Sequence, residues 1–309
     1  MLMPAGSGSR VAAFIAACLL ALPLRAEVQE LRISRQYGLP YLVPVILEDQ
    51  RLIEKHAKAR GLGEMKITWT TLGTGGTSTD SLLAGNLDFV VSGISNMMLL
   101  WSRTGGQVRA VSAMSAVPLL LLTRNPNVKT IADLTEKDRI AVPTIKVSMQ
   151  STILGIAAAA LVSGGELNNH FSVPPYQYQS LKTPGVRTLL SSTEVMGGPA
   201  TITVFFGTVK FHDANPKTMA AINAAIAEAM EFIGKDKRAA AETYQKATKD
   251  KMSVDELAAM IDLPGFAFTM APHGTMQYAE HMFKTGVIKT RPAIWKDVFF
   301  PEAHALAGN

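Results

Sequence analysis

The sequence lacks the features that mark several protein classes. Its 309 residues include one cysteine, Cys18, so the chain has no disulfide framework. The 30 basic and 25 acidic residues are scattered and form no basic run of the kind that binds nucleic acid. There is no Gly-Lys-Ser/Thr phosphate loop, no HExxH and no Gly-x-Ser-x-Gly, and the histidines show no metal-binding spacing. We therefore expect no cofactor, no metal, no nucleic-acid partner and no catalytic residues.

The amino terminus is the one long apolar feature. Arg10 precedes the run VAAFIAACLLALPL, and Arg25-Ala26 follows it, which is typical of a secretory signal cleaved after Ala26. No later stretch is long and apolar enough to span a membrane. Ile15 to Cys18 also fits a lipoprotein signal, but the apolar residues after Cys18 fit a mature lipoprotein poorly. We therefore expect residues 1–26 to be a signal peptide and the protein to be secreted into the periplasm, with the lipid-anchored form as the less favoured alternative.

The rest of the chain alternates between strand and helix patterns, which is typical of an α/β fold with a mostly parallel sheet. A second α/β unit lies between two strongly apolar strands, 117–123 and 200–206, which we expect to cross between lobes. The predicted division is a discontinuous first lobe, 27–120 and 205–309, with an inserted second lobe, 121–204. Two lobes joined in this way form a cleft that closes like a hinge.

Small and polar residues follow several of the predicted strands. The loop Gly73-Thr74-Gly75-Gly76-Thr77 precedes a predicted helix for which Thr77 and Asp80 would form the capping box. Glycines allow a ligand to approach backbone N–H groups at a helix start, where the helix dipole is positive. A plain strand-to-helix turn is the alternative for this loop taken alone.

Several segments together resemble the substrate-binding proteins of ABC importers, in the branch that serves nitrate, sulfonates, taurine and pyrimidine thiamine precursors. The segments are ISRQYGLPYLVPVILE, LGTGGTSTDSLLAGNLDFVVSGIS, IAVPTIKVSMQSTIL, HFSVPPYQYQSL, GGPAT and PAIWKDVFFPE. The resemblance implies the two-lobed, twice-crossed (type II) periplasmic binding protein fold. It also implies a monomer that captures a small anionic or polar solute and delivers it to a membrane permease.

Ligands of open α/β sheets lie beyond the carboxyl ends of the strands, so the loops at those ends are the candidate binding residues. They are Gln36, Tyr37, Gly38, Gly73, Thr74, Gly75, Gly76, Thr77, Ser95, Asn96, Ser148, Gln150, His170 and Ser172. Each also has a structural alternative: Ser148 and Ser172 as helix caps, His170 as a strand-end residue and Tyr37 as a cover over the core. Arg35 is a further candidate for pairing with a sulfonate or carboxylate.

Two other functions remain open at this stage. Pyrimidine-precursor synthases share this fold but use a cysteine-rich cluster, and the mature chain has no cysteine. A ligand-sensing module that presents its ligand to a membrane receptor would have the same sequence features as a transport protein.

The inserted lobe is shorter than the resemblance implies, by one strand and one helix after KVSMQ. The helix ILGIAAAALV is apolar on all sides, so we expect a small lobe that leaves Ile153, Leu154, Ile156 and Leu161 partly uncovered unless a partner covers them.

Overall fold

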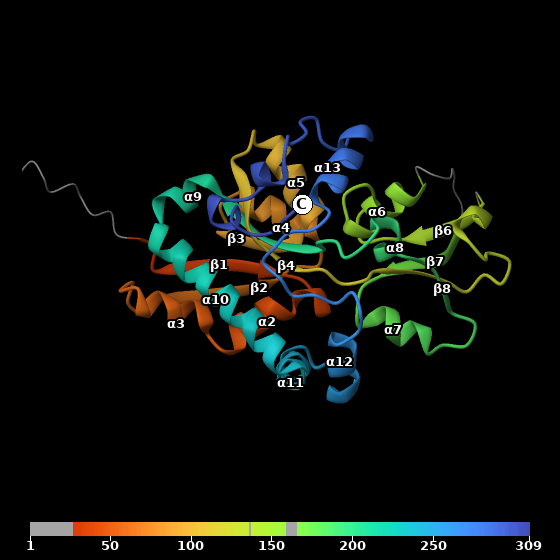
Figure 1. The fold of residues 1–309 in the computed structure, drawn as a ribbon, viewed down its shortest axis with the longest axis horizontal. Helices are drawn as coiled ribbons and strands as arrows, with labels where there is room; N and C mark the ends of the chain where they lie inside the picture. The colour runs from red at the N-terminus through yellow and green to blue at the C-terminus, as the bar shows by residue number, and fades with distance from the viewer. Residues whose placement is uncertain (1–26, 136, 159–165) are drawn as a thin grey trace, which may run out of the picture.

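The computed structural model describes residues 27–135, 137–158 and 166–309, which form two β-sheets with helices on both sides (Figure 1). The first sheet has the order β2 (Lys66–Thr71), β1 (Glu30–Arg35), β3 (Phe89–Gly93), β9 (Thr203–Thr208) and β4 (Val108–Ser115). β9 pairs antiparallel with both β3 and β4, whereas β1 is parallel to β2 and β3. The predicted mostly parallel sheet is therefore confirmed only in part: β2, β1, β3 and β4 run in one direction, and β9 between β3 and β4 runs opposite because the chain returns from the second sheet there.

The second sheet has the order β6 (Asp138–Ala141), β7 (Glu166–Ser172), β5 (Leu120–Thr123) and β8 (Arg187–Ser191). β5 is antiparallel to both of its neighbours, and β6 is parallel to β7. Every strand of this sheet falls within the segment that leaves the first sheet after β4 and returns to it at β9. The insertion of one α/β unit into another is thus present.

The chain crosses between the sheets slightly before the two predicted crossing strands, 117–123 and 200–206. β5 begins at Leu120 and pairs only within the second sheet, while β9 begins at Thr203 and pairs only within the first. The crossings are therefore residues 116–119 and 197–202. A third segment lies beside the first crossing, where the N–H groups of Ala116 and Ala267 each donate to the carbonyl oxygen of the other at 2.7 Å.

Side-chain alternation along the first sheet divides its core into two layers. Phe89, Val91 and Phe205 face the helices α2 (Leu42–Asp49), α3 (Leu52–Ala59), α10 (Pro216–Lys235), α11 (Lys237–Thr248) and α12 (Val254–Ile261). Val90, Val204 and Phe206 face α4 (Gly75–Leu83), α5 (Ile94–Arg103) and α13 (Thr275–Lys284). The remaining elements of this part are α9 (Val209–Ala214) and the 3₁₀ turns η1 (Leu39–Tyr41), η3 (Trp295–Val298) and η4 (Pro301–Ala303). Successive side chains of a strand point to opposite faces of the sheet, so apolar residues on both faces require a helical layer on each side.

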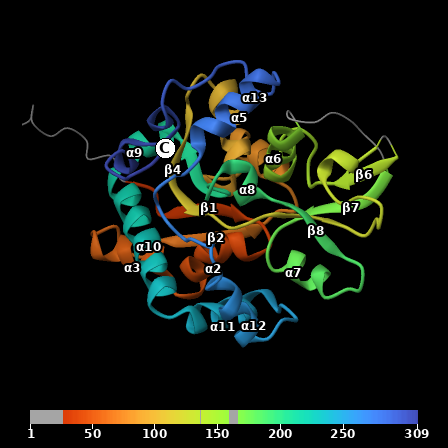
Figure 2. The same ribbon diagram turned by 45° about the vertical axis from the view of Figure 1, so that its right-hand side comes forward.

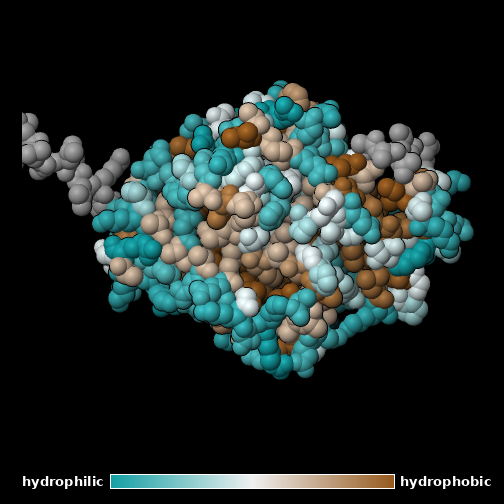
Figure 3. Space-filling view, in the orientation of Figure 1, coloured by the Kyte–Doolittle hydropathy of each residue, from teal (hydrophilic) through white to brown (hydrophobic). Residues whose placement is uncertain are grey.

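The second sheet carries α6 (Met149–Ala158), α8 (Ser192–Met196), α7 (Tyr176–Leu181) and the 3₁₀ turn η2 (Ile131–Asp133). Figure 2 shows α6 and α8 above this sheet and α7 below it. On the face drawn in Figure 3, apolar surface gathers over this half of the molecule more than over the first. The shortening of the inserted lobe stays a prediction, since residues 159–165 lie outside the described part of the chain.

The predicted exposure of the α6 helix is wrong for Ile153. Its side chain is fully buried, and Leu154 and Ile156 are half-buried; Leu161 lies outside the described residues. The cover comes from α13, which packs on both α6 and α5. A Cβ added to Gly155 of α6 would lie 2.5 Å from Nε2 of His281, so the two helices are in close contact.

The predicted capping of α4 is also wrong. The helix begins at Gly75 with Thr74 as its N-cap, and the Thr74 hydroxyl accepts a hydrogen bond from the N–H of Thr77 at 3.2 Å. At the start of α12, Ser253 and Glu256 form a capping box. Among the described residues, no helix is both long enough and apolar enough to cross a bilayer.

Candidate functional site

A cavity of about 170 Å³ lies between the two sheets. Its walls come from the loop after β1, the starts of α4, α5 and α6, the loops after β6 and β7, and the second crossing where it meets β9. The lining residues are Gln36, Tyr37, Pro40, Tyr41, Gly73, Gly75, Gly93, Asn96, Pro143, Thr144, Ser148, Met149, Gln150, Val173, Ile202 and Thr203. Because Pro143 to Gln150 and Val173 belong to the inserted segment and the others to the first lobe or the second crossing, the cavity is an interlobe site.

Three helices begin at this cavity. α4 and α5 start from the first lobe at Gly75 and Ile94, and α6 starts from the inserted lobe at Met149. The first N–H groups of a helix have no partner within the helix, and together they give its start a partial positive charge. Helix starts from both lobes therefore act on one cavity.

Gly75 lets the start of α4 pack closely against Ser92 and Asn96. A Cβ built at Gly75 would lie 2.7 Å from the Ser92 hydroxyl and would overlap the Asn96 amide. No side chain larger than hydrogen fits there unless Asn96 moves. Gly75 is therefore required by the packing of the protein itself, Gly73 has open space around it, and the approach of a ligand to this loop stays a prediction.

A chain of hydrogen bonds holds the polar wall of the first lobe in place. The Tyr41 hydroxyl donates to Gln36 Oε1 at 3.1 Å, and Gln36 Nε2 donates to the Ser92 hydroxyl at 3.0 Å. Asn96 Nδ2 donates to the same Ser92 oxygen at 3.0 Å. Burial raises the pKa of Tyr41 well above its usual range, so the phenol remains protonated and stays a donor. The amides of Gln36 and Asn96 are thereby oriented before any ligand arrives.

Across the described ranges, 27–135, 137–158 and 166–309, no charged side chain lines the cavity. Arg35, the candidate cation from the sequence, donates through Nη2 and Nε to Glu48 Oε2 at 2.9 and 3.2 Å. The Arg35 side chain is 12% exposed, its guanidinium is paired with Glu48, and it does not line the cavity. An anion held by this lining is held by N–H and O–H groups.

Gln150 offers the most available polar group from the inserted lobe. It lies in the first turn of α6, is 7% exposed and lines the cavity, and its amide makes no hydrogen bond within the described residues. The neighbouring Ser148 hydroxyl accepts from the N–H of Ser151 at 3.2 Å, so Ser148 also caps α6. Neither polar atom of the Gln150 side chain is sealed from solvent, so a ligand or water in the cavity can bond to it.

The structure brings seven of the fourteen predicted residues together at this cavity. They are Gln36, Tyr37, Gly73, Gly75, Asn96, Ser148 and Gln150.

Gly38, Thr74, Gly76, Thr77 and Ser95 lie next to the cavity without lining it. Gly38 has φ of +103° and packs against Pro174, where a side chain would be strained and crowded. Thr74 and Thr77 bond to each other through their hydroxyls at 2.9 Å, and Ser95 is fully buried against Met149.

His170 and Ser172 lie apart from these residues. His170 is in β7 opposite Leu122 and lines a different hollow, bordered by Ser180 and Thr183 of the α7 side. Burial lowers the pKa of His170. Ser172 is buried at the end of β7 opposite Leu120, and Pro175, not Ser172, is the N-cap residue of α7.

Sequence reasoning missed most of the apolar lining. Met149 lies between two predicted residues, Ser148 and Gln150, so its position in the same loop was the available signal. Ile202 and Thr203 come from the second crossing, and no local pattern in the sequence places a crossing beside a ligand.

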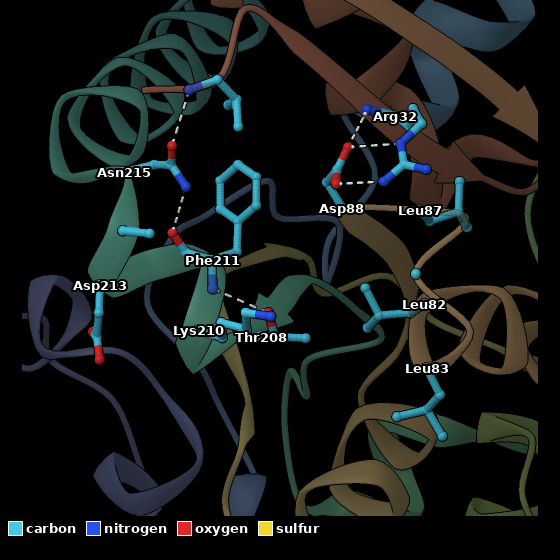
Figure 4. A pocket seen from close by; sticks show the side chains of 13 residues that line it. Arg32, Leu82, Leu83, Leu87, Asp88, Thr208, Lys210, Phe211, Asp213 and Asn215 are labelled. Carbon is cyan, nitrogen blue, oxygen red and sulfur yellow. Dashed lines mark hydrogen bonds and ion pairs between the residues drawn. The ribbon is translucent and has the colours of Figure 1, made fainter. Parts of the chain in front are cut away.

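A larger hollow of about 850 Å³ lies on the first lobe, between the end of α4 and α9 (Figure 4). Arg32 donates to both oxygens of Asp88 on one wall, at 2.8 and 3.1 Å. On the other, Asn215 accepts from the N–H of Val28 and donates to the carbonyl of Phe211. These polar groups are satisfied by the protein itself, whereas Lys210, which also lines this hollow, is exposed and its ammonium makes no hydrogen bond or ion pair within the described residues.

No family model and no curated protein matches this chain. Solved structures do match it. The alkanesulfonate-binding protein SsuA from Xanthomonas axonopodis pv. citri, bound to MOPS, has a TM-score of 0.70 at 18% identity and covers 89% of this chain and 99% of its own. The periplasmic aliphatic sulphonate binding protein SsuA from Escherichia coli has a TM-score of 0.67 at 17% identity, with 89% and 93% covered. The periplasmic nitrate-binding protein NrtA from Synechocystis PCC 6803 has a TM-score of 0.68 at 12% identity, with 88% and 84% covered. The chain therefore has the two-lobed α/β fold of the periplasmic binding proteins.

Proposed function

We propose that this chain is the solute-binding component of an ABC importer. It captures a small anionic or polar solute, of the sulfonate, taurine, nitrate or pyrimidine class, between a lobe formed by 27–120 and 205–309 and a lobe formed by 121–204. It then delivers the solute to a membrane permease. The proteins with the same fold are named as binding proteins for alkanesulfonates and nitrate, which supports this class of function.

One observation carries the proposal: polar groups from both lobes converge on one cavity between them. Asn96 and Gln36 belong to the first lobe, and Ser148 and Gln150 to the inserted one. A ligand that bonds to both sets is bound more tightly when the lobes are together, so its binding energy favours the closed form. That coupling is what a transport partner can recognise.

The remaining parts of the proposal concern the setting. We propose a periplasmic monomer, secreted through the signal at residues 1–26, that uses no cofactor and catalyses no reaction.

Native mass spectrometry of protein purified without refolding tests the function directly. We expect a ligand of constant small mass bound one to one. Isothermal titration of the ligand-free protein with nitrate, methanesulfonate, isethionate, taurine and a pyrimidine then ranks the solutes, and the tightest should raise the melting temperature in proportion to the logarithm of its concentration over its Kd.

Two outcomes would contradict the proposal. The first is a protein that retains nothing on purification and binds none of these solutes. The second is a recovered ligand that the protein converts to a compound of different mass, which would favour the enzyme alternative. A genomic position beside a receptor gene, without permease and ATPase genes, would favour the sensing alternative.

A further inference from the structure

The interlobe cavity has a one-sided electrostatic character. Among the described residues, its lining comprises amides, hydroxyls, two phenols, one thioether and apolar groups, with no carboxylate. The acidic side chain of Glu48 is paired with Arg35 and is not part of the lining. The helices α4, α5 and α6 have nine, ten and ten residues. Their positive ends therefore act on a cavity that has no charged side chain among its described lining residues.

This character treats an anion and a cation differently. An oxyanion accepts hydrogen bonds from N–H groups and is attracted by the positive helix ends. An ammonium group is repelled by the same helix ends and finds no charged partner among the described lining residues. Most of the polar lining is buried: Gln150, Asn96, Ser148 and Thr203 are 7, 8, 7 and 1% exposed. An ammonium in this cavity would lose its water without gaining a charged partner from this lining.

We infer that the interlobe site accepts oxyanions whose remaining part is uncharged and rejects zwitterions that carry an ammonium group, with Gln150 as a specificity-determining residue. This inference rests on the proposed function. It divides the proposed solute class, because it separates unsubstituted and hydroxylated sulfonates from taurine.

The two tyrosines do not reverse this preference. The faces of Tyr37 and Tyr41 could attract an ammonium by a cation–π contact, but such a contact is weaker than the penalty for desolvating the charge. Tyr37 is 60% exposed, so an ammonium beside it would remain in water and gain little from the site.

Gln150 has the position and chemistry to distinguish ligands by their charge. Its side chain lies in the first turn of α6 and is almost fully buried, and its amide has no partner among the described residues. The amide N–H₂ can donate to an oxyanion, and a carboxylate of the same shape cannot. A single isosteric change therefore removes the preference for the uncharged oxyanion without changing the side-chain volume.

The first test compares two ligands that differ mainly in charge. Isethionate and taurine are both two-carbon sulfonates, and they end in a hydroxyl and an ammonium respectively. Isothermal titration of the full mature chain at pH 7 should give a Kd for taurine about tenfold or more above that for isethionate, because the ammonium of taurine would lose its water without gaining a charged partner among the described lining residues. Equal or tighter binding of taurine would overturn the inference while leaving the proposed function intact.

The second test uses Gln150→Glu, with Gln107→Glu as the matched control on an exposed residue between α5 and β4. A carboxylate at a helix start is favourable to the helix, so the variant should keep its circular dichroism spectrum. It should bind the tightest oxyanion of the wild type about tenfold or more weakly, and its ratio of isethionate to taurine affinity should fall by a similar factor.

Gln150→Ala separates loss of a donor from gain of a charge. It should weaken the oxyanion about tenfold, the effect of losing a hydrogen bond to a charged group, while keeping the preference for isethionate over taurine. Oxyanion affinities within about twofold of wild type in both Gln150 variants would overturn the role of Gln150, since loss of such a bond costs more than that. Failure of the wild type to bind any oxyanion would instead reject the proposed function, and the inference with it.

Discussion

The sulfur of Met149 lies 3.0 Å from the hydroxyl oxygen of Ser95, which joins the first turn of α6 in the inserted lobe to the first turn of α5 in the other lobe. Met149 is 4% exposed, and Ile153 one turn further along α6 is fully buried. Full burial of an aliphatic side chain of this size contributes about 1.5–3 kcal/mol. The lobes are therefore held together on one side of the cavity by apolar contacts that need no ligand.

Gly93→Ala tests this contact. The φ of Gly93 is −58°, which alanine adopts without strain, but the added Cβ would lie 2.8 Å from Cγ of Met149. We expect α6 to be displaced from α5, with a loss of about 1–3 kcal/mol in unfolding free energy, the usual cost of overpacking. Small-angle scattering of the ligand-free protein should show a larger radius of gyration than the wild type.

The matched control is Gly234→Ala in α10, where an added Cβ meets nothing within 4 Å. It should leave the scattering curve unchanged and raise stability slightly, because alanine favours a helix over glycine. Superimposable scattering curves for wild type and Gly93→Ala would show that Met149 does not set the separation of the lobes.

Gly75→Leu tests the helix-start wall. The side chain would collide with Ser92 and Asn96 and displace the Asn96 amide, so calorimetry should show a loss of affinity for the wild-type ligand of about tenfold or more, the effect of a lost bond to a charged group. Gly76→Leu is the control, since the nearest atom to its Cβ would be the Thr74 hydroxyl at 3.8 Å. Equal affinity in Gly75→Leu and wild type would place the ligand elsewhere.

Acid should weaken a link between the inserted lobe and α12. The Lys182 ammonium lies 2.5 Å from Glu256 Oε1, and this contact, with the hydrogen bonds from Ser253, lowers the pKa of Glu256 to about 2. A carboxyl whose pKa is lower in the folded state stabilises the fold above its unfolded pKa, and this contribution is lost as the pH falls toward the folded value. The window therefore runs from about pH 4.5 down to about pH 2.

The measurement is the difference in melting temperature between wild type and Glu256→Gln. We expect a positive difference at about pH 6 that shrinks by about pH 3 and is small in size, because both side chains are partly exposed. A difference that stays constant across this range would show that the Glu256 charge contributes nothing to stability there.

The order of elements could be predicted from local patterns. The buried strand β3 is a continuous apolar run, and the capping box at Ser253 and Glu256 requires only residues three apart. Loops at strand ends are recognisable for the same reason, which is why Gln36, Gly75, Asn96 and Gln150 could be identified from the sequence alone as residues of the cavity.

Contacts between distant segments could not be predicted in this way. The helix α4 begins at Gly75, so its N-cap is Thr74 and not Thr77. Both threonines lie in the same loop and can cap a helix, so the sequence alone does not decide between them. The position of His170 depends on the pairing of β7 with β5, and the burial of Ile153 depends on α13, which is distant in the chain. Such relationships are set by tertiary packing, which leaves no periodic signal in a single sequence.

A crystal structure of the protein as purified, without refolding, tests the central claim most directly. The account predicts density for one small oxyanion in the interlobe cavity, with its oxygens accepting hydrogen bonds from the Gln150 amide and from N–H groups at the start of α4. A structure in which that cavity holds only water while a bound solute occupies another hollow, such as the one beside Arg32 and Asp88, would contradict it.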